Sequence, residues 1–177
     1  MATTYELISS YTVTGSSTSI TFSSIPQTYK DIIIKYNLMV DFSDGYRSYA
    51  YYTTNNSGNY NRAMIFAVDS GTGVSSSPNT NAAIPYLCGF TTAIDGNANY
   101  YGCGELTIID YASSSYAKGA IWDAGVMSSQ PTTTRAIGFG GNQIYSTGAI
   151  TSITLRPGGA GAMQIGSRAS IYGLKSS

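Results

Sequence analysis

The stretch Asp31-Ile32-Ile33-Ile34-Lys35-Tyr36-Asn37-Leu38-Met39-Val40-Asp41-Phe42 decides the fold of this chain. Every even-numbered residue in it is apolar or aromatic, whereas four of the six odd-numbered residues are polar or charged. Alternation with a period of two predicts a half-buried β-strand, because successive side chains point to opposite faces of a sheet. At roughly 3.3 Å per residue the strand spans about 40 Å. We therefore expect it to be the central strand around which the others are arranged.

Shorter segments of similar character follow one another along the rest of the chain, separated by Gly, Ser, Asn and Pro residues that favour turns. The Ser/Gly/Thr-rich segment 70–81 is predicted to be an exposed loop. Gly138-Phe139-Gly140-Gly141 is predicted to form a bulge or tight bend. The further strands that we expect cover residues 5–13, 19–22, 46–54, 64–68, 84–91, 103–109, 117–123, 136–139, 149–156 and 167–174.

No segment combines a 3.6-residue period with helix caps, so little or no helix is expected. Many short strands separated by turns are typical of antiparallel sandwiches and barrels. We therefore predict an all-β fold, an antiparallel, jelly-roll-like β-sandwich of about eight to ten strands. The 177 residues are enough for one domain with a core, and we assign 1–177 to a single domain in which residues 1–4 could form a short N-terminal arm.

The composition excludes several classes of function. Charged residues make up 10% of the chain and the formal net charge is zero, so nucleic-acid binding has no electrostatic basis. No run of 18 apolar residues occurs, so we expect no membrane span. Residues 1–5 have neither a basic nor an apolar segment, so we expect no signal peptide.

The absence of histidine narrows the possible chemistry further. It excludes Ser-His-Asp and Cys-His nucleophilic sites and the usual zinc sites. The phosphate-binding sequence Gly-x-x-x-x-Gly-Lys does not occur either. Cys88 and Cys103 are most simply two small buried thiols, although one disulfide between them stays open. We therefore expect no enzyme, no cofactor, and no catalytic or metal-binding residue.

Two sets of acidic residues leave weaker alternatives open. Two carboxylates could act together in a glycosidase, and the acids considered for this role are Asp41, Asp44, Glu105, Asp110 and Asp123. Asp41, Asp44 and Asp95 lie in or beside expected loops, where calcium takes oxygen ligands, but their spacing matches no EF-hand. Turn formation and surface exposure explain these acids more simply.

A tyrosine-rich segment is the main candidate for a contact surface. Tyrosine side chains could stack on sugar rings or form a protein interface, and ordinary packing on a sheet face explains them equally well. The residues concerned are Tyr46, Tyr49, Tyr51, Tyr52 and Tyr60.

The two ends of the chain carry motifs that resemble a known family. They comprise Leu7-Ile8, Ile20-Thr21-Phe22-Ser23-Ser24-Ile25-Pro26-Gln27-Thr28-Tyr29-Lys30-Asp31-Ile32-Ile33-Ile34-Lys35, Ile150-Thr151-Ser152-Ile153-Thr154-Leu155-Arg156-Pro157 and Ser167-Arg168-Ala169-Ser170-Ile171-Tyr172-Gly173-Leu174-Lys175, with a looser match at 57–62. The chain resembles the small β-rich virion proteins of tailed bacteriophages, of the type common in cyanophages and other aquatic phages. The resemblance runs over nearly the whole chain, but 70–143 is generic.

The resemblance implies a jelly-roll-like structural protein of the virion, made in the host cytoplasm and assembled as a homotrimer. Its first implied role is a capsid decoration or cement protein, with the major capsid protein or another virion protein as partner. The alternative is a tail or head fibre module that recognises a host surface glycan through tyrosines. The family has no catalytic motif to carry over. Low charge suits close packing between copies, and cytoplasmic synthesis agrees with few cysteines.

Overall fold

The computed structural model describes residues 4–41, 48–56, 60–68, 71–79, 86–93, 101–126, 136–158 and 161–175. For residues 41, 48–49, 60–62, 68, 71–79 and 86–93 the description is limited to the backbone. The strands are β1 (Tyr5–Thr12), β2 (Ile20–Phe22), β3 (Asp31–Asp41), β4 (Ser48–Thr54), β5 (Tyr60–Val68), β6 (Gly71–Asn79), β7 (Tyr86–Ala93), β8 (Gly102–Ile108), β9 (Lys118–Val126), β10 (Ala136–Ile144), β11 (Ile153–Pro157), β12 (Ala162–Met163) and β13 (Arg168–Leu174).

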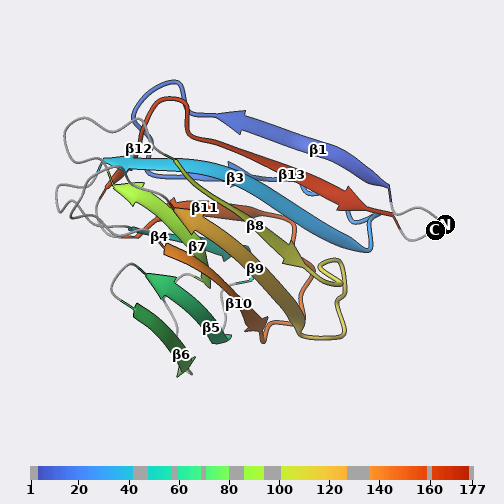
Figure 1. Cartoon of the computed structure of the whole chain (residues 1–177). Coiled ribbons are helices and arrows are strands. Elements are labelled where there is room, and N and C mark those ends of the chain that lie inside the picture. The colour runs from blue at the N-terminus through green and yellow to red at the C-terminus, as the bar shows by residue number, and fades with distance from the viewer. Residues whose placement is uncertain are drawn as a thin grey trace.

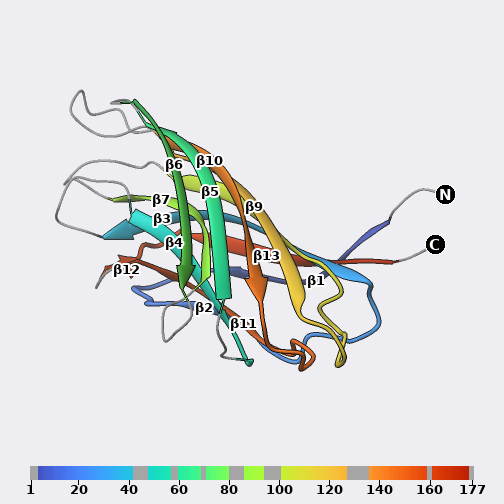
Figure 2. The same ribbon diagram turned by 90° about the horizontal axis from the view of Figure 1, so that it is seen from below.

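These strands form one connected sheet that folds into two layers (Figures 1 and 2). The larger layer has the order β1-β13-β3-β8-β9-β10-β5-β6, and the smaller layer has the order β2-β11-β4-β7. The layers join where Met39 and Val40 of β3 pair in parallel with Thr92 and Ala93 of β7. The other strand pairs are antiparallel, so the predicted all-β antiparallel sandwich is confirmed.

Eight of the strands have the order of a jelly roll. Counted along the chain, β1, β2, β3, β4, β7, β8, β11 and β13 are its first to eighth strands. One layer then reads first-eighth-third-sixth and the other reads second-seventh-fourth-fifth. This arrangement of two four-stranded antiparallel sheets is the double-sheet jelly roll.

Two inserted hairpins widen the larger layer beyond the jelly roll. The hairpin β5–β6 lies between β4 and β7 in the chain, and β9–β10 lies between β8 and β11. Both add to the β8 edge, in the order β9-β10-β5-β6. With the two-residue strand β12 they raise the number of described strands to thirteen, more than the eight to ten expected.

The long predicted strand is central, as expected. Residues 31–37 of β3 pair with β13 on one side, and residues 32–38 pair with β8 on the other. Its even-numbered residues point between the layers, where Ile32, Ile34 and Leu38 are completely buried. The hydrophobic core therefore lies between the jelly-roll sheets and extends under β9 and β10 through Trp122 and Ile144.

Two local predictions were wrong. Residues 71–79, predicted to lie in a loop, form the edge strand β6 along β5, because Ser and Thr backbones accept a strand geometry when a partner is available. Gly138-Phe139-Gly140-Gly141, predicted to form a bulge or tight bend, lies within the regular ladder between β9 and β5. A Cβ at Gly140 would come within 2.7 Å of Trp122 Cζ2, so this glycine accommodates the buried indole ring.

A buried lysine fastens the loop between β10 and β11. The ammonium group of Lys118 donates hydrogen bonds to the backbone carbonyls of Ser146, Thr147 and Gly148, at 3.3, 2.6 and 2.6 Å. Burial lowers the pKa of Lys118. The sequence showed no sign of this site, because a lysine on a strand is most often exposed.

The described residues form strands, turns and coil without a helix. Accordingly, none of the described segments is a helix long and apolar enough to cross a membrane. The possible N-terminal arm, residues 1–4, lies outside the described residues except for Thr4.

Candidate functional site: a charged groove on the larger sheet

The register of the larger sheet places four polar residues side by side on its outer face. Ser170 of β13 faces Lys35 of β3, Lys35 faces Glu105 of β8, and Glu105 faces Asp123 of β9. Each of these residues alternates with a buried neighbour, so all four side chains point away from the core. Residues from four strands, separated by up to 135 positions, thus form one row across the sheet.

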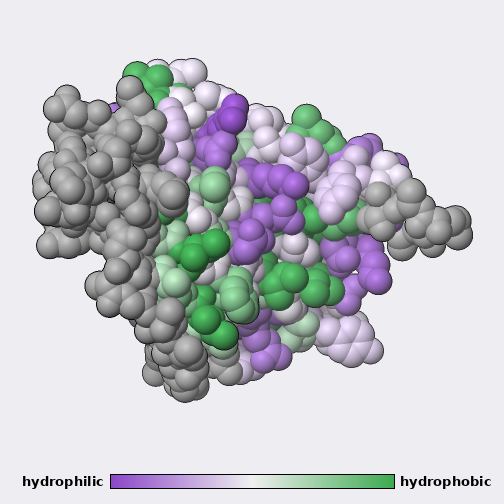
Figure 3. Space-filling view, in the orientation of Figure 1, coloured by the Kyte–Doolittle hydropathy of each residue, from purple (hydrophilic) through white to green (hydrophobic). Residues whose placement is uncertain are grey.

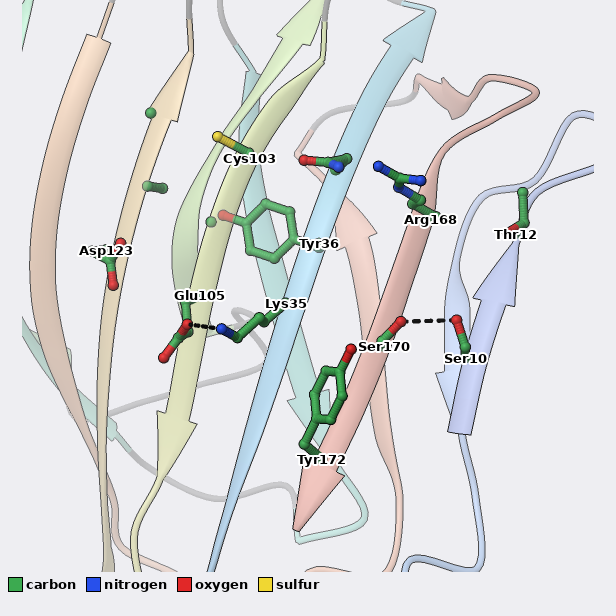
Figure 4. A pocket seen from close by; sticks show the side chains of 14 residues that line it. Ser10, Thr12, Lys35, Tyr36, Cys103, Glu105, Asp123, Arg168, Ser170 and Tyr172 are labelled. Atoms are coloured by element: carbon green, nitrogen blue, oxygen red, sulfur yellow. Dashed lines mark hydrogen bonds and ion pairs between the residues drawn. The ribbon is translucent and has the colours of Figure 1, made fainter. Parts of the chain in front are cut away.

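This row crosses an open groove of about 690 Å³ (Figure 4). Its lining is mostly polar, and glycine and other small residues leave room between the larger side chains. The groove is lined by Ser10, Thr12, Lys35, Tyr36, Asn37, Cys103, Gly104, Glu105, Asp123, Ala124, Gly125, Arg168, Ser170 and Tyr172.

An ion pair spans the middle of the groove. Lys35 Nζ lies 3.1 Å from Glu105 Oε2, and the same ammonium lies 5.8 Å from the centre of the Tyr5 ring. The hydrogen bond and charge of Glu105 raise the pKa of Lys35. Both side chains stay in contact with water, so the pair adds little to the stability of the isolated chain.

Asp123 has no comparable partner. In the described part of the chain its carboxylate takes part in no ion pair, since the salt bridges there join Lys35 to Glu105 and Lys175 to Glu6. Partial burial, and next to it the negative charge of Glu105, raise the pKa of Asp123, although Lys35 acts in the opposite direction. Two like charges on directly facing positions of an antiparallel pair destabilise the sheet.

The second positive charge lies on the β13 side of the groove. With the Asn37 amide oriented to satisfy its neighbours, Arg168 Nε and Nη2 both donate to its oxygen at 3.2 Å, and its nitrogen donates to the Tyr36 carbonyl. The guanidinium is therefore held over β13 in the row of Asn37, on the side of β3 away from Glu105, as Figure 4 shows. Positive charge lies over β13 and β3, and negative charge over β8 and β9.

The acidic candidates from the sequence are only partly brought together. Glu105 and Asp123 face each other, whereas Asp110 lies in the turn after β8, where its backbone N–H donates to Asp31 Oδ1 at 2.9 Å. Facing residues have Cβ atoms about 5 Å apart, which is close to the separation of about 5–5.5 Å between the carboxyl groups of a retaining glycosidase. Glu105 and Asp123, however, lie side by side on one sheet face, whereas the two acids of a glycosidase flank the bond that is cleaved. The outward, parallel placement of Glu105 and Asp123 is more typical of a binding surface.

The calcium candidates cannot be assembled from the described residues. Asp44 and Asp95 lie outside them, and Asp41 is described only as the backbone end of β3. Within the described part of the chain, no three side chains of the types His, Cys, Asp and Glu group together as metal ligands.

The tyrosine candidates do not form one described surface. Tyr52 lies on the inward face of β4 and is completely buried in the core. Its proposed role as an interface or glycan contact is therefore wrong. Tyr51 lies on the other face of β4 and is half-buried. Tyr46 lies outside the described residues, and Tyr49 and Tyr60 are described only as backbone positions of β4 and β5.

The thiol of Cys103 is free and exposed, which corrects the expectation of a buried thiol. It faces Asn37 on β3 and so shares the outward side of the sheet with the groove. Cys88 lies in β7, where only the backbone is described.

An exposed apolar patch, not anticipated from the sequence, lies beside the groove on the inserted hairpins. It consists of Ile65, Ile121, Ile137 and Phe139, which are 47–67% exposed. Phe139 directly faces Ile65 on one side and Asp123 on the other. Figure 3 shows hydrophobic residues gathered over β9 and β10, next to hydrophilic residues over β3 and β8. The alternation in β9 and β10 was the signal that could have revealed this patch.

The chain was compared with family models, curated proteins and solved structures. No family model, no curated protein and no solved structure matches the chain.

Proposed function

We propose that the chain is a structural protein of a bacteriophage virion, a decoration or cement protein that binds the outer capsid shell as a homotrimer. The observation that carries this proposal is the apolar patch of Ile65, Ile121, Ile137 and Phe139 on the inserted hairpins. Monomeric soluble proteins rarely expose contiguous apolar surface of this kind, and such patches mark interaction sites. In an assembled particle, this patch would be in contact with another protein subunit.

The motifs that resemble phage virion proteins support the same proposal, because they form paired strands of the jelly roll. The motif at 20–35 contains β2 and the first five residues of β3, and the last two motifs contain β11 and β13. β2 pairs with β11 in the smaller layer, and β3 pairs with β13 in the larger layer. Motifs separated by more than 100 residues therefore form one continuous part of the jelly roll. Of the inserted hairpins, β6, β9 and nearly all of β10 lie in the generic part of the chain, whereas β5 begins in the looser match at 57–62.

Binding to an assembled shell would stabilise it by mass action, since a ligand of the assembled state alone favours that state. The test is the copy number in purified virions of the phage that encodes the chain, measured by quantitative mass spectrometry against the major capsid protein. A ratio of one, or a fixed simple fraction, is expected for a protein that tiles the shell. Complete absence from the particle would overturn the proposal.

A second candidate function is a fibre module that binds a host surface glycan. The charged groove favours it, because hydroxyl, amide, carboxylate and guanidinium groups line the same groove as Tyr172, and sugars bind to such combinations. A few to a few tens of copies per virion would favour this function. A glycan array should then give hits that Asn37→Ala weakens, whereas Tyr51→Ala, on the other layer, should leave them unchanged.

A further inference from the structure

The charges on the outer face of the larger sheet are ordered by strand. Arg168 on β13 and Lys35 on β3 are positive, and Glu105 on β8 and Asp123 on β9 are negative. Across these four adjacent strands, two positive charges are therefore followed by two negative charges. Folding does not require this order of charges, since the facing carboxylates of Glu105 and Asp123 repel each other.

Apolar side chains flank this charged centre on both sides. Tyr5 and Leu7 of β1 lie on one flank and are 54% and 57% exposed. The register puts them on the outward side together with Tyr172. Ile121, Ile137 and Phe139 lie on the other flank. The face therefore has an apolar flank, a positive half, a negative half and a second apolar flank.

This order is complementary to itself under a half-turn. An axis that runs along the strands above the gap between β3 and β8 exchanges β3 with β8, β13 with β9, and β1 with β10. Lys35 then faces Glu105 of a second copy, and each positive half covers a negative half. A contact in which the same patch serves both subunits is the ordinary form of a two-fold interface.

The sizes of the side chains are complementary under the same rotation. In the row that contains Arg168, the position on β9 is Gly125, so the guanidinium meets an open place beside Asp123 of the second copy. In the row that contains Tyr172, the position on β9 is Ile121, so the ring meets an exposed apolar side chain. Two sheets that pack face to face keep their strands within about 30° of each other, which preserves these pairings near the axis.

We propose that the outer face of β1-β13-β3-β8-β9-β10 binds the same face of a second copy of this chain about a two-fold axis between β3 and β8. The contact goes beyond the proposed function, because neither attachment to a shell nor a trimer requires it. It makes a second copy of the chain, rather than the shell, the partner of Ile121, Ile137 and Phe139 in the apolar patch. The rotation places Ile121 over Tyr172, and this apolar contact supplies binding energy. It places Phe139 and Ile137 over Ser10 and Thr12, where they form a rim around the charged centre. The charged centre fixes the orientation, because a half-turn about an axis across the strands would instead place Lys35 over Lys35 and Glu105 over Glu105.

Two charge-reversed variants test the proposal. Lys35→Glu/Arg168→Glu makes all four central charges negative, and Glu105→Lys/Asp123→Lys makes them all positive. By analytical ultracentrifugation up to about 0.1 mM, the wild type should have twice the mass of either variant. Each variant alone should bind itself at least about tenfold more weakly than the wild type does. An equimolar mixture of the two should recover the doubled mass.

The matched control reverses an ion pair away from this face. Glu6→Lys/Lys175→Glu exchanges the partners of the 2.7 Å bridge between the chain ends and should keep the wild-type mass. Phe139→Ser tests the flank independently of charge and should also weaken the doubling. Circular dichroism must show the same strand content in all variants.

Three outcomes would overturn the inference. They are a wild type with the same mass as the charge-reversed variants, a mixture that fails to associate, and a control that dissociates as the variants do. A wild type that does not double but is present on virions in a fixed ratio would remove this contact and leave the proposed function intact. Glycan binding in the groove of such a non-associating chain would identify a saccharide as the occupant instead.

Discussion

The buried phenol ring of Tyr36 on β3 occupies the space that a side chain at Gly104 on β8 would need. The two residues face each other across the strands, and a Cβ at Gly104 would lie 2.6 Å from Tyr36 Cζ. Trp122 and Gly140 repeat the arrangement between β9 and β10. An aromatic ring that packs over the glycine facing it fills the space left by the missing side chain and fixes the register of the two strands.

Replacing Gly104 with alanine should therefore destabilise the fold. The added methyl group collides with the ring and with the backbone carbonyl of Asp123, and overpacking of this kind costs about 1–3 kcal/mol. Thermal unfolding should show a Tm lower by about 2–4 °C for each kcal/mol. Gly119→Ala is the matched control, because nothing lies within 4 Å of its Cβ position. Equal losses in both variants would contradict this explanation.

The sequence predicts the scaffold well where burial on one face decides it. β3 and β9 show clear alternation because one face of each lies against the core. β6 could not be predicted, since its Ser- and Gly-rich sequence carries no such signal and pairing with β5 makes it a strand. Both inserted hairpins add to one edge of the sheet through pairing between distant strands, which the local sequence likewise does not predict.

The candidate site was predictable residue by residue but not as a group. Alternation with Leu106 and Ile108 already turns Glu105 outward, and the buried Trp122 does the same for Asp123. Which outward residues meet depends on the register between β13, β3, β8 and β9, and strand register is set by the whole sheet. The sequence alone therefore groups Asp110 with Glu105 and Asp123, although only the latter two share a row.

Removal of the Lys118 ammonium should cost more than the loss of an exposed lysine. In Lys118→Met the side chain keeps its apolar length, but three carbonyls that it bound lose their donor. We expect a loss of about 2–4 kcal/mol in the free energy of unfolding, measured by urea titration. Lys175→Met, at an exposed ion pair, should change it little. A Lys118→Met variant as stable as the wild type would show that the loop does not depend on this lysine.

Asn55 should hold the loop before β11 in place. Its side-chain oxygen accepts hydrogen bonds from the backbone N–H groups of Thr151 and Ser152, at 2.8 and 3.2 Å. Asn55→Ala should raise the hydrogen-exchange rates of these two amides at least about tenfold, measured by NMR. Asn55→Asp keeps the accepting oxygen and should retain most of the protection. Unchanged exchange in the alanine variant would mean that the loop is held by other contacts.

The stability of the chain should depend on pH through Asp123. Its pKa is raised in the folded state, so between its ordinary value of 3.8 and the raised value the folded chain binds more protons than the unfolded chain. Stability therefore falls as the pH rises through this window, and the cost persists above it. Asp123→Asn removes the charge and its repulsion by Glu105 while it keeps the shape of the side chain. The variant should be more stable than the wild type by a few tenths of a kcal/mol near pH 7 and gain nothing near pH 3. Urea titrations at both pH values, at protein concentrations too low for association, provide the measurement. An equal gain at both values would show that the effect does not come from the charge.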